Sequence, residues 1–306
     1  MKPGLVFVIF LLASVSAFCQ SADTTPSTSK KIKILSWNIY MLPGIVKVKG
    51  REARAAAIGK ILSQSDYDII VFQEAFHQQA RRQIHRYLDT AYPYQAGPAN
   101  RKLLSFRTNS GLWIFSKYPI TGSHAIIFKN RSGIDAFSRK GGLLAEITVD
   151  HHPLQIVGTH LQSSGRDWIR HSQCVEFYHK LLKEYGRPYV PQIICGDFNI
   201  NKKNEDGYGQ MLQILKASDG ELSGSNFYSF DPLENDLKNN EGDPPHLIDY
   251  VLLRNNEQGA VTFLRREIKT IRQQWCPKHA DLSDHFALEA ELLLEDGTWC
   301  ANNAGM

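Results

Sequence analysis

Residues 32–39 read Ile-Lys-Ile-Leu-Ser-Trp-Asn-Ile, and residues 68–74 read Asp-Ile-Ile-Val-Phe-Gln-Glu. Both stretches are apolar runs of strand length, and both carry polar side chains near one end. Between them, residues 51–65 place apolar side chains on one face at helical spacing. The order of strand, helix and strand predicts a βαβ unit, which is the start of an α/β fold.

The rest of the chain continues this alternation of strands and helices. A second helix is predicted from about Gln78 to near Pro93, and a third over 168–185. Further strands are predicted over 111–116, 143–149, 154–161, 192–200, 246–253, 261–269 and 285–294. Many strands with few helices predict two packed mixed β-sheets with helices outside, a four-layer α/β/β/α sandwich. Since no repeat or linker divides the chain, we expect one domain over 31–296, with a C-terminal tail over 297–306.

The first 20 residues differ from the rest in composition. Lys2 precedes an apolar run over 5–13, and small residues follow up to Ala17, which is typical of a signal peptide. A transmembrane anchor would need about 20 apolar residues, roughly twice what this run offers. Lipoprotein processing at Cys19 is disfavoured by the bulky Phe18 before it. We therefore expect cleavage near Ala17 or Cys19, export to the periplasm or medium, and a flexible Ser- and Thr-rich start over 21–30.

Composition and charge narrow the function class. Apolar residues make up 42% of the 306 residues, as in an ordinary globular protein. The formal net charge of +4 comes from Lys and Arg residues that are scattered along the chain, which argues against a nucleic-acid partner. We also expect a monomer. Cys174 and Cys195 lie in apolar patterns and are predicted to be buried thiols. Cys276 and Cys300 could pair in an oxidising compartment, which the sequence leaves open.

Seven polar residues fall at or near the ends of predicted strands. They are Asn38, Glu74, His160, Asp197, Asn199, Asp249 and His285. Each alone has a structural explanation, as a strand cap, a core histidine or a turn residue. As a set they would bury charges at a cost of several kcal/mol unless a cation offset them. Oxygen ligands without a Cys/His cluster predict Mg²⁺, with Mn²⁺ as a substitute, rather than Zn²⁺.

The segments around these residues resemble a known superfamily in their order along the chain. They are residues 36–43, 72–74, 158–162, 196–199, 247–250 and 283–285. Together they resemble the endonuclease/exonuclease/phosphatase superfamily, which implies a DNase I-like sandwich. Within it, residues 38–43, 158–162 and 135–141 are similar to neutral sphingomyelinases, and Arg170 and Gln173 extend the match.

The resemblance implies a role for each site residue. His285 would be the general base, oriented by Asp249, and His160 would donate a hydrogen bond or proton toward the leaving or a phosphoryl oxygen, although these two labels could be exchanged. The remaining assignments are Glu74 and Asn38 for the metal, Asp284 for a second metal or metal-bound water, Asp197 and Asn199 for orienting the nucleophile or the phosphate, and Lys140 with Asp135 for the lipid phosphate. A solvated charged loop is the alternative for Lys140 and Asp135.

The implied function is Mg²⁺-dependent hydrolysis of sphingomyelin, or a related sphingophospholipid, to ceramide and a phosphorylated head group at a membrane surface. Membrane-lytic members carry a long aromatic hairpin before the last Asp-His pair, whereas residues 273–280 are short here and offer Trp275 either for an interface or for packing. The alternatives are a DNase I-like nuclease, a phosphatase or phospholipase C for another phosphoester, and a binding module without catalysis.

Overall fold

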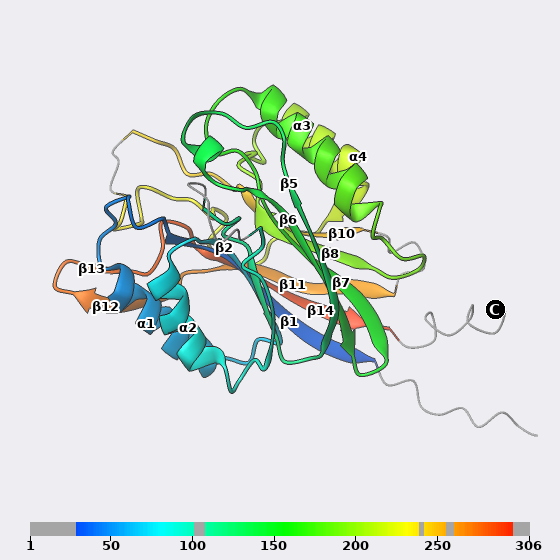
Figure 1. The fold of residues 1–306 in the computed structure, drawn as a ribbon, viewed down its shortest axis with the longest axis horizontal. Helices are drawn as coiled ribbons and strands as arrows, with labels where there is room; N and C mark the ends of the chain where they lie inside the picture. Colours follow the sequence, from blue (N-terminus) through cyan, green and yellow to red (C-terminus); the bar gives the residue numbers. More distant parts are fainter. Residues whose placement is uncertain (1–28, 101–107, 239–241, 255–259, 296–306) are drawn as a thin grey trace, which may run out of the picture.

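Two mixed sheets face each other in the computed structural model, which describes residues 29–100, 108–238, 242–254 and 260–295, and helices cover the outer face of each sheet (Figure 1). The first sheet has the order β11-β14-β1-β2-β4-β3 and the second β5-β6-β7-β8-β10-β9. Within these ranges the predicted α/β/β/α sandwich is confirmed. Cys300 and the leader lie outside the described residues.

The strands of the first sheet are β1 (Lys30–Met41), β2 (Ile69–Ala75), β3 (Tyr94–Ala96), β4 (Trp113–Ser116), β11 (Val261–Lys269) and β14 (Ala287–Leu294). Those of the second are β5 (Ile120–Ile127), β6 (Gly141–Val149), β7 (His152–His160), β8 (Gln192–Asp197), β9 (Ala217–Asp219) and β10 (Asp249–Arg254). A separate hairpin joins β12 (Arg272–Cys276) to β13 (His279–Asp281). The helices are α1 (Arg51–Ser63), α2 (Gln78–Leu88), the 3₁₀ turn η1 (Gly133–Phe137), α3 (Asp167–Phe177), its π-helical extension η2 (Tyr178–Leu182) and α4 (Glu205–Leu215).

The two sheets share one internal pattern. In the first sheet β1 and β2 are parallel, and in the second β7 and β8 are parallel, while the other named pairs are antiparallel. The apolar core includes side chains such as Ile34 and Val71 of the first sheet and Val157 and Ile194 of the second. A second core lies between the first sheet and α1 and α2. Each parallel pair therefore sits in the centre of its sheet, buried on both faces, as parallel strands require.

The sequence predicted most of the long elements but missed several. The prediction for residues 261–269 matches β11 in both bounds, and the helix predicted to begin near Gln78 is α2. The short strands β3, β9, β12 and β13, the edge strand β5 and the helix α4 were not predicted. Cys174 and Cys195 are buried, as expected. Among the described residues no helix is long and apolar enough to cross a membrane.

Candidate active site

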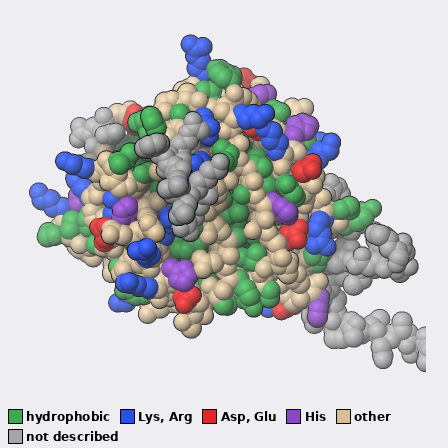
Figure 2. Space-filling model, viewed as in Figure 1, with side chains coloured by type: hydrophobic (Ala, Val, Ile, Leu, Met, Phe, Trp, Pro, Cys, Tyr) green, Lys and Arg blue, Asp and Glu red, His purple; other side chains and the backbone are tan. Residues whose placement is uncertain are grey.

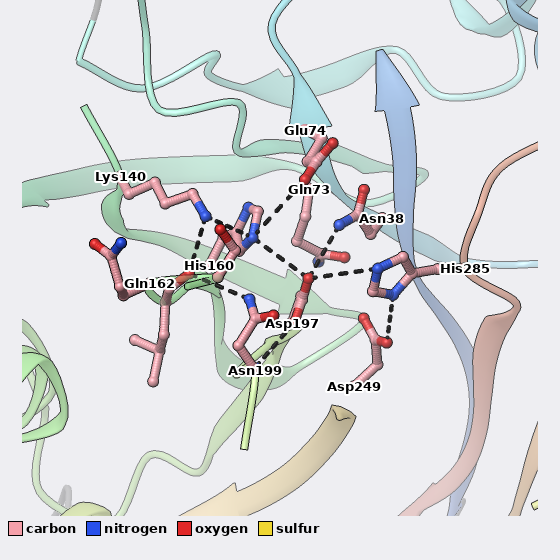
Figure 3. A network of polar contacts seen from close by, with 12 residues as sticks. Asn38, Gln73, Glu74, Lys140, His160, Gln162, Asp197, Asn199, Asp249 and His285 are labelled. Atoms are coloured by element: carbon pink, nitrogen blue, oxygen red, sulfur yellow. Dashed lines mark hydrogen bonds and ion pairs between the residues drawn. The ribbon is translucent and has the colours of Figure 1, made fainter. Parts of the chain in front are cut away.

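The strand register of the second sheet gathers three of the predicted residues in one row. His160, at the end of β7, lies opposite Asp197 at the end of the parallel strand β8. Asp197 in turn lies opposite Asp249 at the start of the antiparallel strand β10. Because these strands are hydrogen-bonded neighbours, the three side chains meet at the same end of the sheet. Glu74 and Asn38 approach from β2 and β1 of the facing sheet (Figure 3).

Two site residues occupy left-handed backbone positions that glycine usually takes. Glu74 has φ of 57° and Asn199 has φ of 52°. For residues other than glycine this conformation costs on the order of 1 kcal/mol or more, and such strain clusters at functional sites. The first lies against a neighbouring segment: a Cβ on Gly111 would lie 3.0 Å from Cα of Glu74, and the amide of Ala75 donates to the carbonyl of Gly111 at 2.9 Å. The second is held because the Asn199 amide donates to Oδ1 of Asp197 at 3.0 Å.

His285 is paired with a carboxylate. Its Nδ1 lies 2.8 Å from Oδ2 of Asp249, and its Nε2 lies 3.8 Å from Oδ2 of Asp197. Burial alone would lower the pKa of His285. The charges of Asp249 and Asp197 together outweigh burial and raise this pKa to about 10. A proton on Nδ1 pointing at Asp249 leaves Nε2 directed into the site, which is the tautomer that a general base needs.

The segment that carries His285 is tied to β1. The indole Nε1 of Trp37 donates to the carbonyl of His285 at 2.9 Å, and Oγ of Ser283 donates to the carbonyl of Asn38 at 2.5 Å. The fully buried guanidinium of Arg54 donates to the carbonyl of Leu282 at 2.7 Å. These three bonds fix the main chain before and at His285. The main chain and the bond to Asp249 together hold the imidazole in place.

His160 is paired with an ammonium group instead. Nζ of Lys140 lies 2.9 Å from Nε2 of His160, and both side chains are buried. Since an ammonium group can only donate, Nε2 accepts, which places the imidazole proton on Nδ1. Burial, with Lys140 and His285 as further causes, lowers the pKa of His160 well below its usual value. His160 is therefore a neutral imidazole in this arrangement.

Asp197 lies at the centre of the cluster. Its Oδ2 accepts from Nδ2 of Asn38 at 3.0 Å and lies 3.3 Å from Nε2 of His160. Burial raises the pKa of Asp197 to about 6, and the charge of Asp249 adds to the rise. The amide of Asn38 thus orients Asp197, while its own Oδ1 accepts from the main-chain amide of Tyr40 at 3.1 Å.

Glu74 has an oxygen atom that nothing in the described chain satisfies. Oε1 lies 3.9 Å from Nε2 of His160, whereas Oε2 is buried without a hydrogen-bond partner. Burial raises the pKa of Glu74 to about 7, and the charge of Asp284 contributes. A buried carboxylate oxygen without a partner is costly, and a divalent cation would satisfy it.

A second group of atoms is also close enough for a cation. Asp197, Asp249 and His285 offer ligand atoms within 4.8 Å of one another. Oδ1 of Asp249 is also buried without a hydrogen-bond partner, but a cation there would meet an imidazole whose raised pKa favours the protonated form. The unsatisfied oxygen of Glu74 is therefore the better candidate for the metal.

The loop before β6 joins the site through Asp135. Oδ1 of Asp135 lies 2.9 Å from Nζ of Lys140, and Oδ2 accepts from the amide and the hydroxyl of Ser163 at 2.7 and 2.9 Å. Because Lys140 and Asp135 are buried, the alternative of a solvated charged loop is wrong. Gln173 supports the same region, since its side chain accepts from the amide of Gln162 and donates to the carbonyl of Asn130, both at 2.8 Å.

Asp284 has a partner that the sequence did not reveal. Its Oδ2 lies 3.0 Å from Nζ of Lys238, and this ammonium group lies 5.1 Å from the centre of the Tyr40 ring. Lys238 precedes β10 in an irregular segment, so no periodic pattern marked it.

The sequence left two roles open for Trp275, contact with an interface and packing within the protein. Its indole packs on Gly50 and donates to the carbonyl of Asp281 at 2.9 Å, so it is a packing residue.

The structure thus brings all ten predicted site residues into two adjoining groups. The inner group is formed by Glu74, Asn38, His160, Asp197, Asn199, Asp249 and His285. Asp135 and Lys140 join it on the side of His160, and Asp284 stands next to His285 with Lys238. Residues 35–285 match the model of the Endonuclease/Exonuclease/phosphatase family.

The chain belongs to the Endonuclease/Exonuclease/phosphatase family. It is 26% identical over 301 residues to a phospholipase C of Staphylococcus aureus, covering 88% of this chain and 90% of that one. It is 24% identical over 331 residues to a sphingomyelinase C of Bacillus cereus, covering 96% and 98%. A crystal structure of a Staphylococcus aureus beta toxin variant with bound magnesium ions matches with a TM-score of 0.77 and 25% identity, covering 85% of this chain and 99% of that one. Within the family, the similarity therefore lies with enzymes that act on phospholipids.

Proposed function

We propose that this protein is a Mg²⁺-dependent phosphodiesterase that hydrolyses sphingomyelin, or a related sphingophospholipid, to ceramide and a phosphorylated head group. The observation that carries the proposal is the buried pair of His285 and Asp249, which faces Asp197 and the unsatisfied carboxylate of Glu74. The names of the relatives supply the substrate class.

His285 acts as the general base in this proposal. Asp249 holds the proton on Nδ1, so Nε2 takes a proton from the water that attacks the phosphorus atom. Without a cation the pKa of His285 is about 10, because Asp249 and Asp197 stabilise its charged form against burial. Positive charge placed near these carboxylates lowers that pKa and makes the neutral base available near pH 7.

His160 and Lys140 act on the phosphate from the opposite side. The low pKa of His160 keeps its ring neutral, so it acts as a hydrogen-bond donor to the leaving or a phosphoryl oxygen rather than as a cationic acid; for this, Lys140 turns from Nε2 to the phosphate and the ring proton moves from Nδ1 to Nε2. Lys140 brings a full positive charge to the anionic diester. Asp197 and Asn199, which are joined by a hydrogen bond, orient the attacking water or the phosphate.

Glu74 is the principal residue that would hold Mg²⁺, with Asn38 and Asp284 beside it. The fit rests on the unpartnered Oε2 of Glu74, its raised pKa and the oxygen-rich donor set. A divalent cation supplies charge neutralisation for the phosphate and its transition state. Mn²⁺ offers the same preference for oxygen ligands and is the expected substitute.

The experiment that tests the function measures phosphocholine release from sphingomyelin vesicles. We expect activity with Mg²⁺, recovery with Mn²⁺ and loss with EDTA. Glu74→Ala and His285→Ala should each lower turnover by about 10²–10⁴-fold, because one removes the metal ligand and the other the base. His179→Ala, an exposed histidine on η2, is the matched control and should retain activity.

Two results would redirect the proposal. Full activity in the chelator would overturn the metal assignment. Cleavage of plasmid DNA without phosphocholine release would favour the nuclease, and release of another head group from other lipids would favour a broader phospholipase C. We also propose residues 31–296 as the catalytic domain of a monomeric protein that is exported by its leader; N-terminal sequencing and sedimentation of the exported protein test these points.

A further inference from the structure

The short helix η1 presents its side chains in an unusual way. Asp135 is buried and contacts Lys140, whereas Ile134 is 83% exposed and Phe137 is 66% exposed. In a water-soluble loop the apolar side chains normally turn inward and the charged ones outward. Here the order is reversed, so folding of the chain leaves most of the apolar surface of Ile134 and Phe137 in contact with water.

The first turn of α3 adds a third apolar side chain to the same region. Trp168 is 56% exposed, although the next residue, Ile169, is buried. The two segments adjoin, because Gln162, shortly before α3, exchanges hydrogen bonds with Ser132, just before η1: the Ser132 amide donates to Oε1 at 3.2 Å and Nε2 donates to the Ser132 carbonyl at 3.0 Å. We call Ile134, Phe137 and Trp168 the apolar rim.

Basic side chains accompany the apolar rim. Lys129 and Arg166 are both exposed, one on the loop before η1 and the other immediately before α3. Figure 2 shows hydrophobic and basic side chains next to each other over the start of α3, at the upper edge of that face. Apolar side chains with adjacent Lys or Arg residues suit a phospholipid surface, where the apolar groups enter the acyl boundary and the cations meet phosphates.

The apolar rim is linked to the candidate active site through η1. Asp135 of η1 contacts Lys140, and Lys140 contacts His160, with 2.9 Å for each contact. A phosphodiester in a bilayer lies at the level of the head groups, so a surface beside the site must reach the membrane for the bond to be cleaved. The hairpin formed by β12 and β13 is short and its Trp275 is packed, so it does not supply that surface.

We propose that the apolar rim, with Lys129 and Arg166, docks the protein on a phospholipid bilayer and directs the active site to the head groups. The inference rests on the proposed function for its substrate, but the docking itself is measured without catalysis. The backbone of the rim is already fixed: Oγ of Ser138 donates to the carbonyl of Asp135 at 2.9 Å, and Asp135 is bound to Ser163. Docking therefore requires little ordering of the chain, which favours binding.

Vesicle binding in EDTA tests the docking separately from hydrolysis. We expect the wild type to float with vesicles of sphingomyelin and phosphatidylcholine, and the double variant Ile134→Ser/Phe137→Ser to bind about tenfold or more weakly, because two exposed apolar side chains are lost. Tyr189→Ser is the matched control, since Tyr189 is 57% exposed but lies before β8, at the end of the sheet opposite Asp197. It should bind like the wild type.

Hydrolysis then separates this proposal from the proposed function. The ratio of turnover on vesicles to turnover on a short-chain, monomeric phosphocholine diester should fall about tenfold in the double variant, in step with binding. Undiminished vesicle binding by the double variant, equal loss in Tyr189→Ser, or no binding by the wild type would each overturn the docking proposal. Normal docking without hydrolysis of either substrate would leave docking in place and overturn the proposed function instead.

Discussion

The two buried histidines of the site have partners of opposite charge, and these partners shift their pKa values in opposite directions. His285 faces the carboxylate of Asp249, which raises its pKa against the effect of burial, whereas His160 faces the ammonium group of Lys140, which adds to the effect of burial and lowers its pKa further. Both rings lie near the same carboxylate oxygen of Asp197. Opposite partners therefore separate a ring that is protonated in the absence of metal from a ring that stays neutral, and such a separation of pKa values is how sites assign acid and base roles.

The largest effect is expected when the partner of His285 is changed. Asp249→Asn keeps the shape but removes the charge, so the pKa of His285 falls and the proton on Nδ1 loses its charged acceptor. Turnover should drop about 10²–10³-fold, because the tautomer of the base is no longer fixed. Phosphocholine release measured across pH 5–10, with NMR titration of the ring, checks both effects.

A matched control for Asp249→Asn is Asp219→Asn on the neighbouring strand β9. Asp219 is also largely buried and pairs with Lys202 and Arg266, away from the two histidines. Its turnover per folded molecule should stay near that of the wild type. Equal losses in the two variants would mean that Asp249 acts on the fold and not on the base.

A somewhat smaller effect is expected on the side of His160. Lys140→Met removes the ammonium group, so the pKa of His160 should rise toward its ordinary value and turnover should fall about 10–100-fold as the phosphate loses its cation. Lys140→Arg keeps the charge and should hold the pKa of His160 low. NMR titration of both variants, alongside vesicle hydrolysis, is the measurement; an unchanged pKa in Lys140→Met would contradict the pairing.

The same difference should appear in the pH dependence of stability without metal. The raised pKa of His285 contributes stability that is complete below the unfolded value of about 6.5 and is lost as pH rises toward about 10. The lowered pKa of His160 acts the other way, because below about pH 6.5 the unfolded chain takes up a proton that the folded ring does not.

Denaturant titrations in EDTA at several pH values measure this dependence. His285→Gln should remove a loss on the order of a few kcal/mol between about pH 6.5 and 10, and His160→Gln should flatten the profile below about pH 6.5. Glu74 and Asp197, whose pKa values are raised to about 7 and 6, also lower stability as pH rises through the acid range, so each variant is compared with the wild type at every pH. Identical profiles would show that the two rings do not titrate differently.

Sequence patterns predicted the buried parts of this fold better than its edges. Strands such as β2 and β8 are buried along almost their whole length and therefore read as continuous apolar runs. The edge strand β5 mixes half-buried and exposed positions with polar residues, and α4 contains two glycines and buries Met211 and Leu215, so neither gave a clear period. The spacing of apolar residues reveals an element only where that element is buried, and β5 and α4 are buried over little of their length.

The site residues on strands could also be predicted better than the site residues in irregular segments. Strand-end residues such as Asp197 and His160 could be found because a shared sheet edge brings them together. The opposite pKa shifts of the two histidines could not, since they depend on which cation or anion reaches each ring across the cleft. Lys238 was missed for the same reason: it stands in an irregular segment and contacts Asp284 across 46 positions of the chain.

The smallest effect on turnover is expected when Lys238 is replaced. Its ammonium group pairs with Asp284, whose charge otherwise helps to raise the pKa of Glu74. Lys238→Met should therefore alter turnover at saturating Mg²⁺ by less than about tenfold, while strengthening Mg²⁺ binding severalfold, because a positive charge near the metal residues is removed. Calorimetric Mg²⁺ titration measures this, with the remote Lys216→Met as control. Weaker Mg²⁺ binding in Lys238→Met would mean that Lys238 positions Asp284 for the metal rather than competing with it.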